Sequence, residues 1–120
     1  MNNSQKKILV IDDDPDIVIC IQIMLEDAGY QVITADQADD IDYLLNELPD
    51  VIILDMLLSG KDGRQITKYL KSKENTRYIP IIMISAHPNA GREAQAHGAD
   101  HFIAKPFEMD HLLAKVARLV

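Results

Sequence analysis

Five short apolar runs recur along the chain, and segments with helical spacing separate them. Their length and their β-branched side chains are typical of buried strands. The runs cover residues 8–11, 32–35, 51–54, 79–84 and 102–104. Near-continuous apolar strands that alternate with helices predict a parallel sheet covered on both faces, because right-handed crossovers place the helices over the sheet. The predicted fold class is therefore α/β with five β/α repeats.

Helix boundaries follow from single residues. Pro15 suits the first turn of a first helix over residues 16–28, Gly29 ends that helix, Pro49 follows the second helix and Gly98 closes the fourth. A chain of 120 residues has room for one domain, with a core over residues 7–120 and a polar extension over residues 1–6. Whether a further domain follows Val120 is left open.

Charge and composition restrict the partners. A formal net charge of −7 argues against nucleic acid as a partner of this domain, because binding a duplex requires clustered Lys and Arg. No apolar stretch reaches the length of a membrane span and no signal peptide pattern is present, which predicts a cytoplasmic protein without a membrane partner. The single cysteine, Cys20, lies in an apolar run and is expected to be buried.

Polar residues follow four of the five runs at the point where each strand should end. They are Asp12 to Asp14, then Asp55, then Ser85 with Ala86, and finally Lys105 before Pro106. In open parallel sheets the ligand site lies at the carboxyl ends of the strands. We therefore expect these residues to converge on one pocket, although each of them alone would be an ordinary turn or cap residue, and Asp14 before Pro15 is expected to cap a helix.

The chemistry of this set is that of an all-oxygen cation site. Crowded carboxylates favour a divalent cation that bridges them, and oxygen ligands suit Mg²⁺. Asp55 could then act as a carboxylate nucleophile that forms an acyl phosphate. Lys105 would supply a charge, and Ser85 a hydroxyl donor, for phosphoryl oxygens.

Four motifs in this order resemble the receiver domain of two-component response regulators. They are ILVIDDDP at residues 8–15, DVIILDM at 50–56 with Asp62-Gly63 shortly after it, IPIIMISA at 79–86, and GADHFIAKPF at 98–107. The resemblance extends from about residue 7 to residue 120. It implies a flavodoxin-like, doubly wound (βα)5 fold.

The resemblance also implies a role for each site residue. Asp55 would be the phosphoacceptor, and Mg²⁺ would be held by Asp13, Asp55 and the backbone carbonyl of Leu57, with Asp12 acting mainly through water. The phosphoryl-binding and switch residues would be Ser85, Ala86, Lys105 and Phe102. The phosphoryl donor would be a histidine kinase or a histidine phosphotransfer protein, and the signal would pass to a downstream protein target or a fused effector domain.

Three other functions are alternatives to phosphoryl acceptance. A receiver-like module that is never phosphorylated and only binds proteins is the main alternative. A flavin or nucleotide binder would need a phosphate-binding loop where the chain has Asp12 to Asp14. A phosphatase acting on external substrates would need a second aspartate where the chain has Leu57, so we expect self-phosphorylation and autodephosphorylation but no turnover of other substrates.

The sequence departs from the family pattern in two places, and it suggests one docking surface. Residues 58–59 are Leu-Ser where the family often has Met-Pro, which predicts a less rigid loop. Ser85 and Lys105 are 20 residues apart, closer than is usual in the family, and residues 88–91 include weak helix formers, so the fourth helix is expected to be short or displaced. Ile19 and Ile23 fall opposite the apolar face of the first helix and are expected to be exposed. Two exposed isoleucines need no functional explanation, but the resemblance implies that this side of the helix contacts the protein donor.

Overall fold

The computed structural model describes residues 6–36, 41–46, 48–58, 61–87 and 90–120, so Ser59, Pro88 and Asn89 lie outside the described residues. Five parallel strands form one sheet in the order β2-β1-β3-β6-β7. Their bounds are β1 Lys7–Ile11, β2 Gln31–Ala35, β3 Val51–Asp55, β6 Ile81–Ser85 and β7 His101–Ala104. The predicted five-stranded parallel sheet is therefore confirmed.

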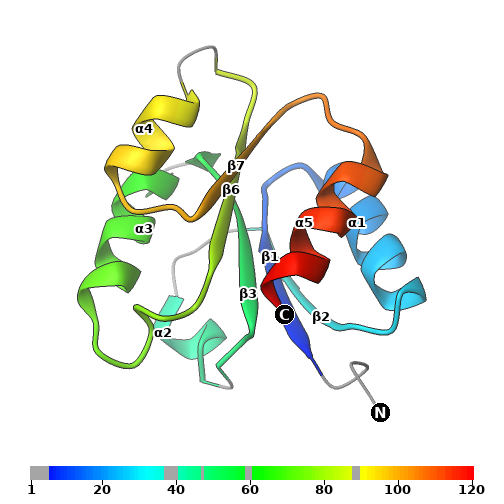
Figure 1. The fold of residues 1–120 in the computed structure, drawn as a ribbon, viewed down its shortest axis with the longest axis horizontal. Helices are drawn as coiled ribbons and strands as arrows, with labels where there is room; N and C mark the ends of the chain where they lie inside the picture. The colour runs from blue at the N-terminus through cyan, green and yellow to red at the C-terminus, as the bar shows by residue number, and fades with distance from the viewer. Residues whose placement is uncertain (1–5, 37–40, 47, 59–60, 88–89) are drawn as a thin grey trace.

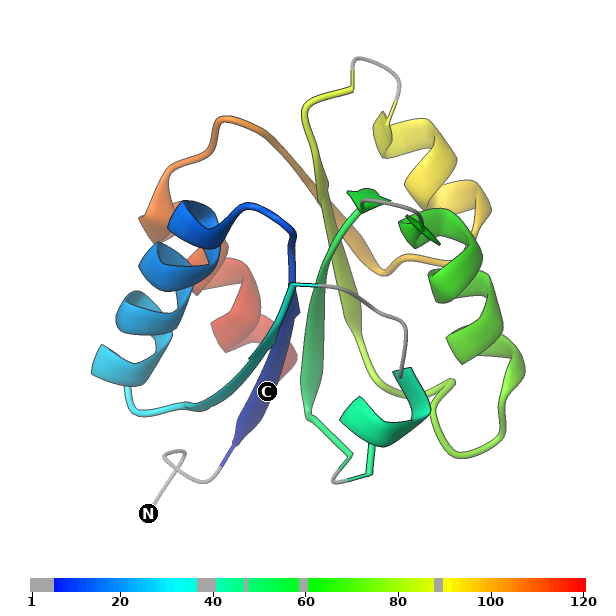
Figure 2. The same ribbon diagram turned by 180° about the vertical axis from the view of Figure 1, so that it is seen from behind.

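Helices cover both faces of this sheet. They are α1 Pro15–Asp27, α2 Ile41–Leu44, α3 Gly63–Ser72, α4 Ala90–Ala96 and α5 Met109–Leu119. Helices α1 and α5 lie on one face, and α2, α3 and α4 lie on the other (Figures 1 and 2). None of the helices in the described ranges has the length and apolar character needed to cross a bilayer.

Alternate residues of each central strand enter opposite cores. Val10 and Ile53 pack with Leu112 of α5 on one face, whereas Leu9 and Leu54 belong to the cluster on the other face. All five residues of β3 are buried. This double burial explains why the strands read as nearly continuous apolar runs rather than as alternating ones.

Some elements differ from their prediction. A short antiparallel hairpin, β4 Leu57–Leu58 with β5 Lys61–Asp62, occupies what was predicted as a loop after β3. Strand β6 begins at Ile81 rather than at residue 79, since Pro80 has no amide hydrogen for the ladder. Helix α4 has seven residues, which confirms the prediction of a short fourth helix.

Cys20 is exposed, so the prediction of its burial was wrong. On α1 the fully buried residues are Ile21 and Leu25, and these set the direction of the buried face. At 3.6 residues per turn Cys20 lies about 120° from the centre of that face. It therefore shares the outer side of the helix with Ile19 and Ile23, which are also exposed.

Helix ends follow the predicted signals. Gly29 and Gly98 adopt φ angles of 101° and 99°, which glycine tolerates without a steric penalty. Asp14 caps α1, because its side chain accepts hydrogen bonds from the backbone amides of Asp16 at 3.0 Å and Ile17 at 3.4 Å. This cap fixes the direction in which the chain leaves β1.

Loss of this cap should destabilise the fold. Replacing Asp14→Ala leaves two amides of the first turn without their acceptor, so we expect the free energy of unfolding in urea to fall by about 0.5–2 kcal/mol. Asp14→Asn is the matched control, since it removes the same charge but keeps an oxygen acceptor. Equal destabilisation by Ala and Asn would show that the charge, and not the cap, is what matters.

Candidate functional site

The strand register places the ends of four neighbouring strands at one edge of the sheet. Ile11 lies opposite Leu54, so that the residue after β1 is beside Asp55. Asp55 in turn lies opposite Ile84, so that Ser85 comes one residue further along. Ser85 pairs with Ala104 of β7, and Lys105 is the residue directly after Ala104. The predicted convergence of polar residues at this edge is therefore what the structure shows.

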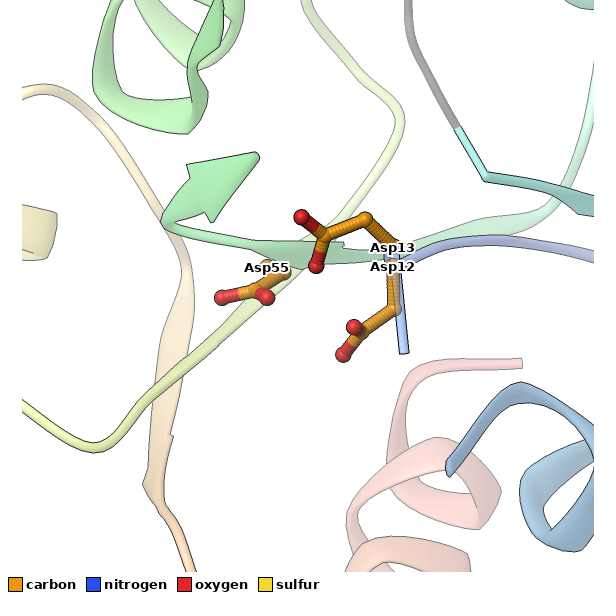
Figure 3. A group of neighbouring side chains, drawn as sticks. All are labelled: Asp12, Asp13 and Asp55. Carbon is orange, nitrogen blue, oxygen red and sulfur yellow. The ribbon is translucent and has the colours of Figure 1, made fainter. Parts of the chain in front are cut away.

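Three carboxylates gather at the ends of β1 and β3. Asp12, Asp13 and Asp55 each offer an oxygen within 4.8 Å of the others. Figure 3 shows their side chains leaving the adjacent strand ends. Asp12 is fully buried, Asp55 is 6% exposed and Asp13 is exposed. One side of the cluster is thus enclosed by protein, and Asp13 forms its open side.

Lys105 sits against the two buried carboxylates. Its ammonium nitrogen donates to Asp12 Oδ2 at 3.1 Å and to Asp55 Oδ2 at 3.3 Å. The backbone amide of Asp14 donates to Asp12 Oδ1 at 2.9 Å, and the amide of Leu57 donates to Asp55 Oδ1 at 3.3 Å. Each buried carboxylate is therefore held by one cation and one backbone amide.

Charge remains unbalanced at this site. The pKa of Asp55 is raised, first by burial and then by the neighbouring charge of Asp12, although Lys105 and the Leu57 amide oppose the shift. Burial alone would lower the pKa of Lys105, but its contacts with Asp12 and Asp55 outweigh burial and raise it. Repulsion between the carboxylates is thus only partly relieved by the lysine.

This donor set fits Mg²⁺. Carboxylate oxygens are the ligands a hard cation prefers, and Mg²⁺ commonly binds through one or two carboxylates with water and phosphate oxygens completing its shell. Three formal negative charges and one positive charge leave two negative charges, which one divalent cation would neutralise. Asp12, Asp13 and Asp55 are the residues that could hold it, and the carbonyl of Leu57 is a further candidate on the adjoining hairpin.

Of the remaining predicted residues, Ser85 and Ala86 lie near the pocket and Phe102 lies apart from it. Ser85 is 3% exposed, and its hydroxyl oxygen accepts from the His87 amide at 3.0 Å. Ala86 is exposed at the pocket rim. Phe102 does not line the carboxylate cluster, because its half-buried ring packs with Met83 and the alanines of α4. The structure therefore groups Ser85 with the site and puts Phe102 beneath α4.

The two predicted docking residues lie on the outer side of α1. Ile19 is 52% exposed and Ile23 is 62% exposed. A hollow of about 370 Å³ that includes Asp12, Pro15 and Ile19 connects this side of the helix with the acidic cluster. The exposed isoleucines are thus close to the chemistry without belonging to it.

Two residues of the neighbourhood gave only weak sequence signals. The amide of Gly63 donates to the Met56 carbonyl at 2.6 Å, and a Cβ on Gly63 would clash with the Asp55 carbonyl oxygen. Asp62 caps α3 by accepting from the Arg64 amide at 2.9 Å. An Asp-Gly pair before a helical segment is a recognisable start signal, but nothing in it reveals how closely Gly63 approaches β3.

The raised pKa of Asp55 predicts how stability depends on pH. A carboxyl whose pKa is higher in the folded than in the unfolded state contributes stability below its unfolded pKa, and this contribution is lost as pH rises through the folded pKa. At pH 7 the ionised carboxylate therefore weakens the metal-free fold. In a chelating buffer at pH 7, Asp55→Asn should raise the midpoint of thermal unfolding by about 3 °C or more.

Two comparisons make this measurement specific. The gain from Asp55→Asn should shrink towards pH 4, and Mg²⁺ should raise the melting temperature of the wild type more than that of the variant. Glu74→Gln, which removes an exposed carboxylate on the loop after α3, should leave the melting temperature nearly unchanged. A melting temperature of Asp55→Asn at or below that of the wild type at pH 7 would contradict the electrostatic account.

Two regulators resemble this chain over nearly all of its length. The phosphate regulon transcriptional regulatory protein PhoB of Escherichia coli (strain K12) is 36% identical over 114 residues, which are 92% of this chain and 50% of that protein. The DNA-binding dual master transcriptional regulator RpaA of Synechocystis sp. is 38% identical over 117 residues, which are 95% of this chain and 48% of that protein. The chain thus spans about half the length of these relatives.

Solved structures agree with these relatives. The chemotaxis response regulator CheY4 of Vibrio cholerae matches with a TM-score of 0.88 at 28% identity, over 97% of this chain and 99% of that one. The receiver domain of NtrX from Brucella abortus matches with a TM-score of 0.85 at 34% identity, over 93% of this chain and 96% of that one. The family profile described as response regulator receiver domain matches residues 8–117. The chain therefore belongs to the receiver domain family of two-component response regulators, and its fold is flavodoxin-like.

Proposed function

We propose that Asp55 accepts a phosphoryl group in a Mg²⁺-dependent reaction and that the domain signals through this modification. The observation that supports this most is the position of the Asp55 carboxylate. It lies at the end of the central strand, 3.3 Å from the Lys105 ammonium and among acidic oxygens that suit a divalent cation. This arrangement offers both a nucleophile and groups that can neutralise a phosphoryl dianion.

Asp55, Lys105 and Ser85 have different roles in the proposed phosphoryl transfer. One oxygen of the Asp55 carboxylate forms a bond to phosphorus while the bond from phosphorus to the donor atom breaks, and the leaving group regains its proton from solvent. Lys105 turns from the carboxylates to the new phosphoryl oxygens, and Ser85, which directly follows the β6 residue paired with Asp55, would donate its hydroxyl to them. Bound Mg²⁺ would supply the positive charge that allows two anions to approach each other.

The donor is a histidine kinase or a histidine phosphotransfer protein, and the acceptor of the signal is a downstream protein or an effector domain. The relatives named as transcriptional regulators are about twice as long as this chain, which fits a receiver joined to an effector in those proteins. The short α4, against which Phe102 packs, lies on the opposite face of the sheet from α1 (Figure 1). Input and output surfaces are thus separate.

Phosphorylation at Asp55 can be tested by intact mass. Exposure to acetyl phosphate or phosphoramidate with Mg²⁺ should add one phosphoryl group, and a chelator or Asp55→Asn should abolish the adduct. Asp13→Ala should slow the reaction by about tenfold or more, because it removes a cation ligand from the open side of the site. Asp16→Asn, an exposed charge in the first turn of α1, is the matched control and should react like the wild type.

The outcomes separate the competing functions. An adduct that persists in Asp55→Asn would assign the modification to another residue. Absence of any adduct in the wild type, with Mg²⁺ binding intact, would favour a domain that only binds proteins.

The outer side of α1 is the proposed docking surface for the donor. Ile19 and Ile23 are one turn apart and exposed, and Cys20 lies beside them. A second, largely apolar hollow of about 310 Å³ adjoins Lys105. It is lined by Ile17, Ala86, Lys105, Pro106, Phe107 and Met109. A helical partner that bears the phosphorylated histidine could contact α1 and this hollow together while the histidine faces Asp55.

This surface predicts a selective defect. The double variant Ile19→Ser, Ile23→Ser should slow transfer from a phosphorylated histidine phosphotransfer protein by about tenfold, since exposed apolar anchors contribute much of the binding energy of such contacts. Phosphorylation by acetyl phosphate should stay at the wild-type rate.

Tyr78→Ser is the matched control for this test, because Tyr78 is 75% exposed but precedes β6 at the opposite edge of the sheet. This variant should accept phosphoryl groups normally from both donors. Equal protein transfer rates for the α1 double variant and the wild type would reject the docking surface.

A further inference from the structure

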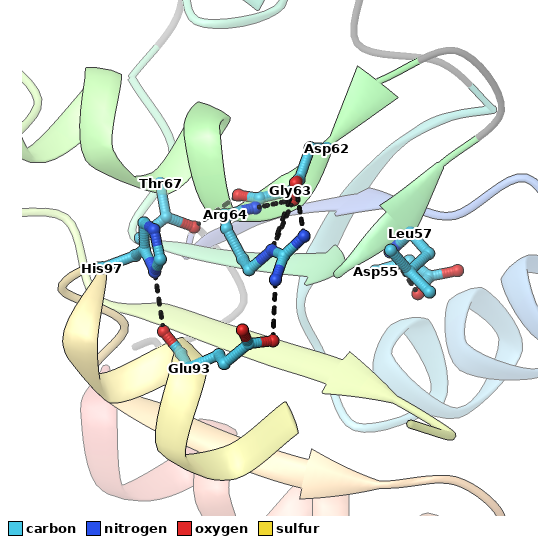
Figure 4. A network of polar contacts seen from close by, with 8 residues as sticks. All are labelled: Asp55, Leu57, Asp62, Gly63, Arg64, Thr67, Glu93 and His97. Carbon is cyan, nitrogen blue, oxygen red and sulfur yellow. Dashed lines mark hydrogen bonds and ion pairs between the residues drawn. The ribbon is translucent and has the colours of Figure 1, made fainter. Parts of the chain in front are cut away.

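Arg64 joins two carboxylates that belong to different parts of the fold (Figure 4). Its Nε and Nη2 atoms donate to Asp62, with the shortest contact at 2.7 Å, and its Nη1 donates to Glu93 of α4 at 2.7 Å. The side chain of Arg64 is only 26% exposed. A planar guanidinium can hold two carboxylates at once in fixed directions, which a lysine ammonium cannot do equally well.

On one side this bridge reaches the segment that adjoins Asp55. Asp62 pairs with Leu57 across the β4–β5 hairpin, and the Leu57 amide donates to the Asp55 carboxylate. Gly63 is anchored to the end of β3 through its hydrogen bond to the Met56 carbonyl. Asp62 therefore cannot move far without moving the backbone that contacts Asp55.

On the other side the bridge reaches α4. Glu93 lies in the middle of this seven-residue helix, and the buried residues Ala90 and Ala94 face the cluster that contains Phe102. A Cβ on Gly91 would lie 3.2 Å from the Phe102 ring. Helix α4 thus rests on apolar contacts beneath it and on the Arg64–Glu93 ion pair beside it.

We propose that Arg64 is a positioning residue that couples α4 to the hairpin of the acidic pocket. The inference rests on the proposed Mg²⁺ site, because the coupling is between occupancy of that site and the position of α4. Since such coupling is reciprocal, binding at the pocket alters α4, and restraint of α4 alters binding at the pocket. The contacts form a continuous chain from Glu93 through Arg64, Asp62 and Leu57 to Asp55.

The test uses the whole chain and follows backbone amides by nuclear magnetic resonance with and without Mg²⁺. In the wild type, Mg²⁺ should change hydrogen exchange both at the pocket and at α4. In Glu93→Ala, which removes the acceptor at the α4 end of the bridge, α4 should exchange about two- to fivefold faster without metal, as expected for loss of one part-exposed ion pair. In this variant the exchange rates of α4 should no longer respond to Mg²⁺, although the pocket amides should still respond.

Two further variants make the result specific. Arg64→Lys, which keeps the positive charge but not the planar guanidinium that holds two carboxylates, should retain part of the α4 response to Mg²⁺. Lys71→Met is the matched control, because Lys71 also lies on α3 and forms an ion pair at 2.8 Å with Asp100, just beyond α4, while its other hydrogen bonds go to the carbonyls of residues 77 and 79. This control should keep the full response of α4 to Mg²⁺.

The outcomes distinguish this inference from the function on which it rests. A wild type in which no amide responds to Mg²⁺ would remove the metal site and the coupling with it. A pocket that responds to Mg²⁺ while α4 responds equally in the wild type and in Glu93→Ala, or responds in neither, would overturn the role of Arg64 and leave the metal site standing.

Discussion

Enclosure of β3 on both faces and along both edges is the constraint on which the rest of the molecule depends. Its five residues are buried, and β1 and β6 occupy its two sides. A strand held in this way has no freedom to slip, since a shift of one residue would turn every side chain to the wrong face. Asp55 is the last residue of this strand, so its carboxylate is held at a fixed point on the sheet edge.

A charge at such a point requires compensation, and the fold supplies only part of it. Lys105 reaches both Asp12 and Asp55, but one ammonium faces three carboxylates. The remaining repulsion between the carboxylates contributes to the raised pKa of Asp55, after the effect of burial. Binding of a cation would relieve this repulsion, and arrival of a phosphoryl group would change the charge balance again. The same excess of negative charge can therefore favour cation binding and, through the bound cation, phosphoryl transfer.

The sequence predicted what depends on periodicity and missed what depends on individual side-chain geometry. The five strands and the convergence of Asp12, Asp55, Ser85 and Lys105 follow from apolar runs that each end in a polar residue. The burial of Cys20 was predicted wrongly, because the prediction rested on the apolar run around it, whereas its angle of about 120° from the buried face of α1 leaves it exposed.

Individual hydrogen bonds and ion pairs between side chains distant in sequence could not be predicted. The Arg64–Glu93 pair joins residues 29 apart in the chain, and no pattern connects them. Lys105 was expected to meet phosphoryl oxygens, whereas without a phosphoryl group it donates to the two carboxylates themselves. Such contacts depend on side-chain directions that become fixed only when the helices pack.

The strand register at the pocket limits where the chain can vary in length. Each strand must end at a set distance from its neighbours for the pocket to form, so inserting or deleting a single residue within β1, β3 or β6 would separate the groups at that edge. Connections at the opposite edge, such as residues 73–80 between α3 and β6, carry no pocket residue. Thr76 and Ile79 of this segment are buried, but its exposed positions 74 and 75 are of the kind that generally tolerates insertions. The domain therefore has one edge with fixed dimensions and one that can be lengthened, and fused segments or tags belong on the second.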